Sequence, residues 1–211
     1  MSSTNKLTRR QREKEFHKQQ IIESAIKIFA QYGYAEATVE KIARDSQFGK
    51  GSLYNYFPSK KILFIESFKY TFKKLFIVAQ GSLSEGKNLQ DKLANYVTVT
   101  IKYFNENKDS FSFLENVFYN MHLDKRLKKV YDYHLMEINN QLAALFENNK
   151  KRDSNLNPTC LAFLFNNYIY SFLLHRVSQK EVYTINEYQS IADELVSLFL
   201  NGYKNYSRLV K

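Results

Sequence analysis

The side chains best suited to binding a partner lie between Thr38 and Lys60, where polar, aromatic and basic residues outnumber apolar ones. The apolar residues follow helical spacing in two groups, on either side of a polar break at Ser46-Gln47. Two short helices joined by a tight turn are the layout of a helix-turn-helix DNA reader, because the major groove accepts one α-helix. The sequence therefore predicts that the second of these helices, at about 50–57, reads DNA.

Residue types around this second helix match what groove contacts require. Gly51 has no side chain and allows close approach of the backbone, and Lys50 and Lys60 bring positive charge to phosphates. Ser52 and Asn55 are short polar side chains that reach base edges or nearby phosphates. Two tyrosine hydroxyls are expected to contact phosphates, with a half-buried structural role as their alternative. The predicted contacts are Lys50, Gly51, Ser52, Tyr54, Asn55, Tyr56 and Lys60.

Positive charge is concentrated in the N-terminal third of the chain. The 211 residues carry a formal net charge of +10, and residues 1–74 hold 15 basic and 7 acidic side chains, against 16 and 14 in residues 75–211. This asymmetry predicts a polyanion partner, double-stranded DNA, with a solvated basic face as the alternative. Residues 1–15 are polar and basic, so we expect a flexible arm that reaches DNA, or else a solubility tail.

Helical periodicity dominates the rest of the sequence, and 6 glycines and 2 prolines are too few for the many turns of a β fold. From about Phe16 an apolar stripe predicts a first helix. Gly33 ends it in a left-handed conformation, with Tyr34 folding back on the last turn. The sequence predicts an all-α fold of about nine helices, the later ones at about 60–79, 88–106, 109–120, 124–149, 158–178 and 186–205.

Other features of the sequence argue against several protein classes. One cysteine, Cys160, excludes a disulfide framework within the chain and indicates a reducing compartment. The sequence has neither a leader-like segment nor a run of ~18 apolar residues, so we expect a soluble cytoplasmic protein with no membrane partner. It has no nucleophile–base set, phosphate loop or metal-ligand spacing. We therefore expect no enzyme activity, no catalytic residue, no cofactor and no metal.

Residues 16–65 closely resemble the TetR/AcrR family of bacterial transcriptional regulators. The resemblance rests on Ala25, Phe29, Gly33-Tyr34, Thr38, Ile42-Ala43 and above all the run from Lys50 to Lys60. It implies a homodimer with a DNA-binding domain at 16–61, a ligand-binding and dimerisation domain at 62–211, and a linking helix at 62–79. It also implies that Thr38 contacts a phosphate.

Some residues depart from the family pattern. Ser46-Gln47, Phe48 and Gly49 stand where Ala-Gly, a smaller aliphatic residue and Ser are common, so we expect the turn to be set differently. Glu40 occupies a position that reads bases in relatives, and a carboxylate there can accept a hydrogen bond from cytosine N4. We favour the simpler interpretation that Glu40 is a helix N-terminal charge, which the helix dipole stabilises.

The resemblance also implies a cavity in the C-terminal body, and the 17 Phe and 16 Tyr of the chain favour a small apolar or aromatic ligand. For each candidate lining residue, ordinary helical core is the alternative, and for the histidine among them a hydrogen-bonded core role. The candidates are Phe104, Phe113, Phe118, Tyr131, His134 and Tyr168.

The last two predicted helices are apolar over a wide arc, which requires more than one partner surface. In the family these helices form a four-helix bundle with those of a second copy. The expected dimer contacts are Phe165, Phe172, Leu195 and Phe199.

These observations lead to the hypothesis of a ligand-responsive repressor that binds a palindromic operator as a homodimer. The alternatives are an activator or ligand-independent DNA binder of the same fold, or a helical ligand carrier.

Overall fold

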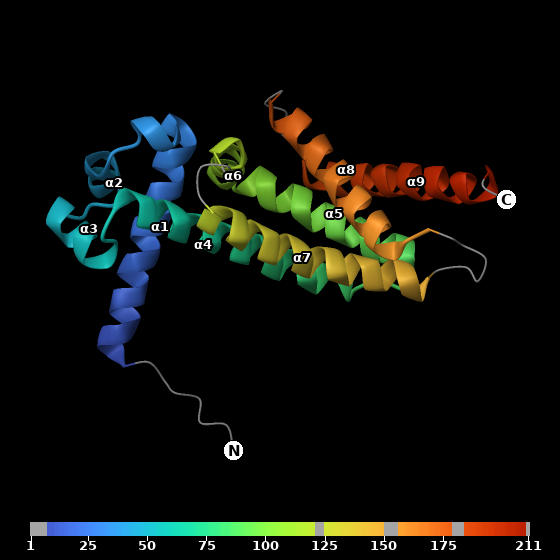
Figure 1. Cartoon of the computed structure of the whole chain (residues 1–211), viewed down its shortest axis with the longest axis horizontal. Helices are drawn as coiled ribbons and strands as arrows, with labels where there is room; N and C mark the ends of the chain where they lie inside the picture. The colour runs from blue at the N-terminus through green and yellow to red at the C-terminus, as the bar shows by residue number, and fades with distance from the viewer. Residues whose placement is uncertain (1–7, 121–124, 150–155, 179–183, 210–211) are drawn as a thin grey trace, which may run out of the picture. The chain divides into compact units, whose positions relative to one another are not determined.

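The computed structural model describes residues 8–120, 125–149, 156–178 and 184–209, and all regular structure within them is helical (Figure 1). The prediction of an all-α fold is confirmed. The nine helices of the described residues are α1 (Arg9–Glu36), α2 (Val39–Asp45), α3 (Lys50–Tyr56), α4 (Lys60–Leu83), α5 (Leu89–Glu106), α6 (Lys108–Asn120), α7 (Lys125–Asn148), α8 (Pro158–Ser178) and α9 (Ile185–Leu209).

Helix α1 begins seven residues before the predicted start. A capping box closes its first turn: the Thr8 hydroxyl accepts from the Gln11 N–H at 3.3 Å, and the Gln11 side chain accepts from the Thr8 N–H at 2.8 Å. Arg9 then pairs with Glu13 one turn later. The predicted flexible arm is therefore wrong for residues 9–15, because capping and polar pairs hold a helix there without an apolar stripe. Residues 1–7 lie outside the described residues.

The sequence predicted that Gly33 ends the first helix in a left-handed conformation; the positive φ is confirmed, but α1 continues past this kink to Glu36. The φ of 67° and ψ of 173° at Gly33 belong to a region that only glycine adopts without strain. The Tyr34 ring folds back after this kink, with its centroid 4.8 Å from that of Phe64 and 6.2 Å from that of Phe29. Only this local reversal lets the end of α1 cover its own apolar face.

Contacts divide the chain into two compact units, and unit 1 consists of Met1–Thr71 with Lys108–Lys128. Its core is an aromatic cluster of Phe29, Phe64 and Phe113, with ring centroids 4.8 to 6.0 Å apart. Asn116 of α6 donates to the carbonyl oxygens of Phe29 and Ala30, just before the α1 kink. Helix α6 therefore belongs to the same compact unit as α1, although the sequence placed 109–120 in the body.

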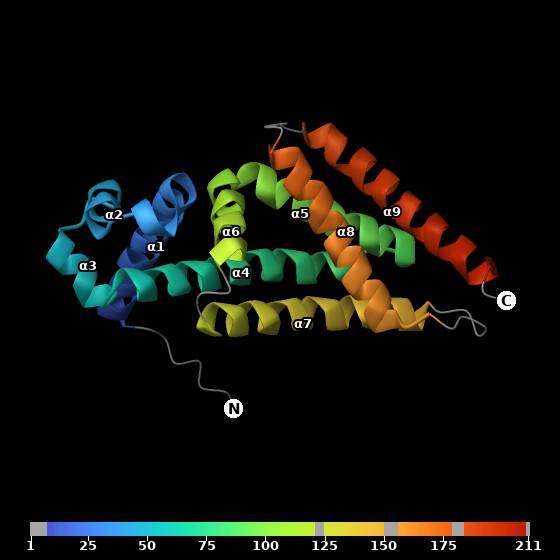
Figure 2. The ribbon, with the colours of Figure 1, turned by 45° about the horizontal axis from the view of Figure 1, so that its top comes forward.

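Unit 2 consists of Phe72–Asn107 with Lys129–Lys211. It holds the second half of α4, which runs to Leu83 rather than the predicted residue 79. Figures 1 and 2 both show α7 running alongside this half of α4. Helices α7, α8 and α9 meet where the Phe165 ring lies 4.9 Å from Phe199 and 6.2 Å from Phe146. The Tyr96 hydroxyl of α5 donates to the side-chain oxygen of Asn166 of α8 at 2.7 Å.

Candidate nucleic-acid interface

Helix α3 has one buried side and one exposed side. Leu53 and the following Phe57 are almost fully buried, so they fix the rotation of the helix. The residues predicted to read DNA lie away from these two positions and are exposed, namely Gly51, Ser52, Tyr54 and Asn55. Thr38 is also exposed, and its hydroxyl caps α2 by accepting from the Lys41 N–H at 3.2 Å. Helix α3 thus turns its polar residues to solvent and buries its apolar residues, Leu53 and the following Phe57.

Lys50, the first residue of α3, forms an ion pair with Glu40 near the start of α2. The Lys50 ammonium, with the backbone N–H of Glu40 as a second donor, lowers the pKa of the Glu40 carboxyl below its ordinary value. The same pair raises the pKa of Lys50. The Glu40–Lys50 ion pair was not predicted from the sequence, because the spacing of the two residues does not show that α2 and α3 bring them into contact.

Tyr56 is half-buried rather than fully available to DNA. Its hydroxyl lies 3.2 Å from Nδ1 of His17, a residue 39 positions earlier in α1. Phe48 packs edge-on against both, with ring centroids 5.3 Å from His17 and 6.3 Å from Tyr56. Phe48 thus fills the space between His17 and Tyr56 with an aromatic ring. Sequence reasoning missed His17, because no local pattern reveals a partner so distant in the chain.

The turn between α2 and α3 is built without a glycine at its left-handed position. Gln47 has φ of 60°, an uncommon conformation for a residue with a side chain. The Phe48 N–H donates to the Ala43 carbonyl at 2.9 Å, and the Gln47 N–H to the Arg44 carbonyl at 3.3 Å, as in a Schellman motif. The Ala-Gly of relatives is therefore replaced by a strained residue that its surroundings hold in place.

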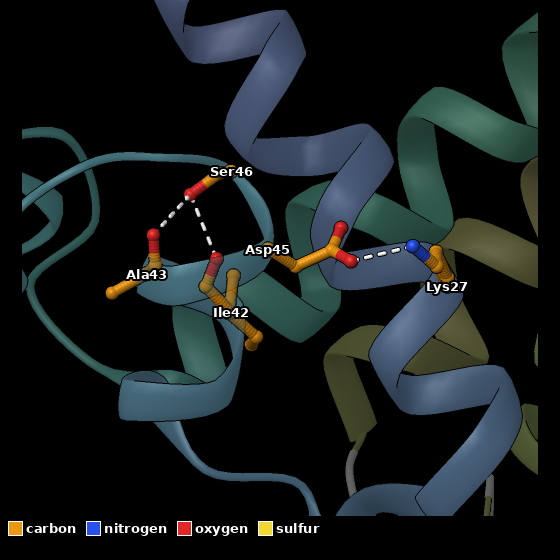
Figure 3. Close-up of polar contacts among 5 residues, drawn as sticks. All are labelled: Lys27, Ile42, Ala43, Asp45 and Ser46. Carbon is orange, nitrogen blue, oxygen red and sulfur yellow. Dashed lines mark hydrogen bonds and ion pairs between the residues drawn. The ribbon is translucent and has the colours of Figure 1, made fainter.

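Two further contacts hold this turn (Figure 3). The Ser46 hydroxyl donates to the Ile42 carbonyl at 2.7 Å and lies 3.3 Å from that of Ala43. Asp45 pairs with Lys27 of α1 at 2.5 Å, and this pair raises the pKa of Lys27. The end of α2 is thus tied both to itself and to α1.

Lys60, the predicted phosphate clamp, makes several contacts within the protein. Its ammonium donates to the carbonyl oxygens of Tyr34 at 2.7 Å, Ala35 at 3.1 Å and Ala37 at 2.8 Å. It also lies 4.7 Å from the centre of the Tyr34 ring. An ammonium has three donors, and all three are used inside the protein. Lys60 thus holds the segment that precedes Thr38, and its contact with phosphate stays a prediction.

The predicted ligand-lining residues are not brought together as one set. Phe113 belongs to the aromatic core of unit 1, whereas Phe104 is buried in unit 2 beside Tyr103. Tyr131 and His134 of α7 both contact the Phe72 ring, with centroids 6.0 and 5.8 Å away. The remaining two are Tyr168, which stacks on Phe199, and Phe118, whose side chain lies outside the described residues.

Two of the four predicted dimer contacts are core residues of the protomer. Phe165 and Leu195 are already buried within unit 2, so they are not available to a second copy, whereas Phe172 and Phe199 are half-buried. The error arose because a helix apolar over a wide arc does not reveal which apolar side faces inward. The large exposed side chains of α8 and α9 are instead Phe163, Leu164 and Leu198, which are 51%, 56% and 60% exposed.

Across the described ranges, no three His, Cys, Asp or Glu side chains gather in a way that would hold a metal ion. Nor does any helix there combine the length and apolar character needed to cross a membrane.

Comparison with known proteins identifies relatives of this chain. Residues 21–66 match the model of bacterial regulatory proteins of the tetR family. The uncharacterized HTH-type transcriptional regulator YuxN of Bacillus subtilis is 35% identical over 92 residues, which cover 44% of this chain and 32% of YuxN. The fatty acid metabolism regulator protein of the same organism is 31% identical over 75 residues, which cover 36% of this chain and 39% of that protein. The match thus spans between about a third and two fifths of the length of these two relatives.

Solved structures share the fold over most of the chain. The transcriptional regulator FadR from Bacillus subtilis, in complex with stearoyl-CoA, superposes with a TM-score of 0.71 at 18% identity, covering 87% of this chain and 98% of that one. FadR from Bacillus halodurans gives a TM-score of 0.72 at 20% identity, covering 88% and 95%. Residues 21–66 thus belong to the tetR family of bacterial regulatory proteins, and the chain as a whole shares the fold of the two FadR structures.

Proposed function

We propose that this protein is a DNA-binding transcriptional regulator of the cytoplasm, a homodimer that represses its target until a small ligand binds. The observation that carries the proposal is the exposed polar side of α3 opposite the buried Leu53 and Phe57. Ser52 and Asn55 offer the short polar groups that read base edges, and Tyr54 offers a hydroxyl to phosphate. Such a face has no role in the core of the protein, so its polar character fits an external partner.

The start of α1 supports the same partner. Arg10, Arg12 and Lys14 are exposed on a capped helix rather than a loose arm, so their charges are held in defined positions. Phosphate contacts by arginine and lysine fix the orientation of a protein on DNA without reading sequence. We propose that α1 provides such contacts beside α3.

Lys60 contributes indirectly in this proposal. It fixes the backbone from Tyr34 to Ala37, and Thr38 follows immediately as the cap of α2. The expected phosphate contact of Thr38 depends on that placement.

The exposed apolar residues of α8 and α9 support a homodimer. Phe163 and Leu164, neighbours in α8, and Leu198 of α9 would be in water in a single copy, and large apolar side chains of this kind are enriched in the cores of protein interfaces. A dimer places two α3 helices in successive major grooves, about 34–36 Å apart along the DNA. We propose that this apolar face replaces Phe165 and Leu195 as the dimer contact.

The α4–α7 pair of unit 2 is the proposed ligand region. The rings of Phe72 and Phe76 lie 5.8 and 6.1 Å from that of His134, and Tyr131 contacts Phe72. Nδ1 of His134 is buried without a hydrogen-bond partner in the described part of the chain. The side-chain oxygen of Asn139, also on α7, is buried and unpartnered in the same way. Buried polar atoms are nearly always hydrogen-bonded, so these two support a ligand with polar groups on an apolar body. Acyl-CoA compounds, which include the ligand of FadR from Bacillus subtilis, meet that description.

A gel-shift titration tests the proposed function. Labelled DNA from upstream of the protein's own gene is mixed with the full chain at moderate salt, with unlabelled competitor DNA present. We expect a specific complex, its release by stearoyl-CoA, and weaker binding by the double variant Ser52→Ala, Asn55→Ala. Absence of any competitor-resistant complex would contradict the proposal, and a transcription assay on the bound site distinguishes a repressor from an activator.

A further inference from the structure

The contact between Glu40 and Lys50 joins the two short helices at the polar face. Glu40 is the second residue of α2, Lys50 is the first of α3, and each side chain is about half exposed. The carboxylate is held from several sides, since the Lys50 ammonium, its own backbone N–H and the Thr38 hydroxyl all favour its charged form. Glu40 is therefore a fixed negative group at the edge of the face that carries Gly51 and Ser52.

A fixed carboxylate at this position weakens DNA binding unless the carboxylate makes a compensating contact with the DNA. Phosphates repel it, and removal of water from a charged group that finds no partner is unfavourable. The major groove offers a suitable donor in the N4 amino group of cytosine, which glutamate accepts from directly. Adenine also offers an amino group, but its N7 is an acceptor that repels a carboxylate. Of the four bases, cytosine therefore best satisfies Glu40.

We propose that Glu40 is a base-specificity determinant that selects a C·G pair in each half-site, and that Lys50 is the residue that positions it. The inference rests on the proposed DNA-reading function and deepens it. Glu40 also lies in the first turn of α2, where the sequence favoured a helix-end charge, and the ion pair with Lys50 is a second constraint that such a charge does not need. Lys50 keeps the carboxylate in one orientation and neutralises its repulsion from nearby phosphates.

Selection of duplexes from a randomised operator library tests this assignment, using the full chain at one fixed salt concentration. Wild-type protein is expected to prefer cytosine about 10- to 100-fold at one position of each half-site. Glu40→Gln should lose that preference and shift it toward adenine, which a glutamine side chain reads through N6 and N7. Glu40→Ala should lose it without acquiring a new one.

Matched variants distinguish a specific effect of Glu40 on base preference from a general effect of negative charge. Glu36→Gln removes one exposed negative charge just before α2 and should leave every base preference unchanged. Lys50→Met should reduce the discrimination for cytosine, and Lys50→Arg should restore it, a response that a merely structural lysine would not give.

Two results would overturn the inference, and they are distinguishable. If wild-type protein selects a sequence and Glu40→Gln selects the same one, the assignment of Glu40 is wrong and the proposed function stands. If wild-type protein selects no sequence at all, the DNA-reading function fails, and the role of Glu40 fails with it.

Discussion

The two compact units differ in what they leave exposed. In unit 1 the aromatic rings of Phe29, Phe64 and Phe113 pack on one another, and the polar face of α3 is presented to solvent. Unit 2 buries its own core around Phe165, yet it leaves large apolar side chains exposed on α8 and α9. Unit 1 thus exposes a polar face, with single exposed rings such as Phe16, whereas unit 2 exposes large apolar side chains on both of its last two helices.

This difference indicates that the two units favour different kinds of partner. Charged and polar groups keep their hydration in the free protein, so an exposed DNA-reading face costs little until DNA arrives. Exposed apolar side chains are unfavourable in water, so they favour a permanent contact such as a dimer. The following changes test this comparison, beginning with the largest expected effect.

Phe29→Ala tests whether unit 1 depends on its own aromatic core. Phe29 is fully buried and contacts both Phe64 and Phe113, so we expect a loss of about 3–5 kcal/mol in the free energy of unfolding. Urea denaturation followed by circular dichroism measures this loss. The control Phe16→Ala removes a ring that is mostly exposed and should change stability by less than about 0.5 kcal/mol. Equal losses for both would show that the cluster is not the core.

Leu164→Asp tests whether unit 2 needs a second copy. The side chain is 56% exposed in one protomer, so the fold should tolerate the charge, whereas a dimer should weaken by about 2 kcal/mol or more. Light scattering over a concentration series measures the shift from dimer to monomer. Ser171→Asp, which places the same charge at an exposed polar position of α8, is the control. A wild-type monomer at micromolar concentration would refute the proposed dimer.

Lys60→Met tests the clamp that precedes α2. Methionine keeps the apolar stem but leaves three carbonyl groups without their charged donor. We therefore expect the free energy of unfolding to fall by about 2 kcal/mol. Thermal melting measures it, and the fluorescence anisotropy of labelled operator should show weaker binding. Lys73→Met, an exposed lysine of the same helix, should affect neither quantity appreciably. An unchanged melting temperature for Lys60→Met would show that these hydrogen bonds contribute little.

Gln47→Gly tests the strain in the turn. Glycine adopts a φ of 60° without the steric cost that a side chain adds, so we expect the free energy of unfolding to rise by about 0.5–1 kcal/mol. Gln47→Val should do the reverse and lose about 1–2 kcal/mol, because a β-branched residue fits this conformation poorly. Chemical denaturation of the pair gives the comparison. The same sign for both variants would mean that the backbone conformation of the turn is not what limits stability.

His134→Gln tests the buried imidazole of unit 2 and should have the smallest effect, below about 1 kcal/mol. Burial lowers the pKa of His134, so the unfolded chain binds this proton more readily than the folded protein. Stability from this source is therefore present above pH 6.5, the ordinary value, and declines as the pH falls below it. Unfolding of both proteins between pH 5 and 8 measures the difference. Parallel curves would show that His134 does not contribute.

Most of the fold was predictable because its signals are local. Helical periodicity and turn residues placed most helix ends within a few residues, and Gly33 was identified from its type and position alone. The exposed residues of α3 were predictable too, because Leu53 and Phe57 indicated which side is buried. The early start of α1 was missed, since it depends on a capping box at Thr8 and Gln11 and has no apolar stripe.

The sequence by itself determined that this chain is helical and which side of α3 is polar, and it predicted a DNA-reading motif at residues 38–60. These properties follow from neighbours within one or two helical turns. Only the tertiary structure decided that Glu40 pairs with Lys50, that His17 contacts Tyr56, and that Lys60 donates to the backbone before α2. It also decided that Phe165 is buried while Leu164 is exposed. Each of these depends on which helices pack together, and residue spacing along one chain does not contain that information.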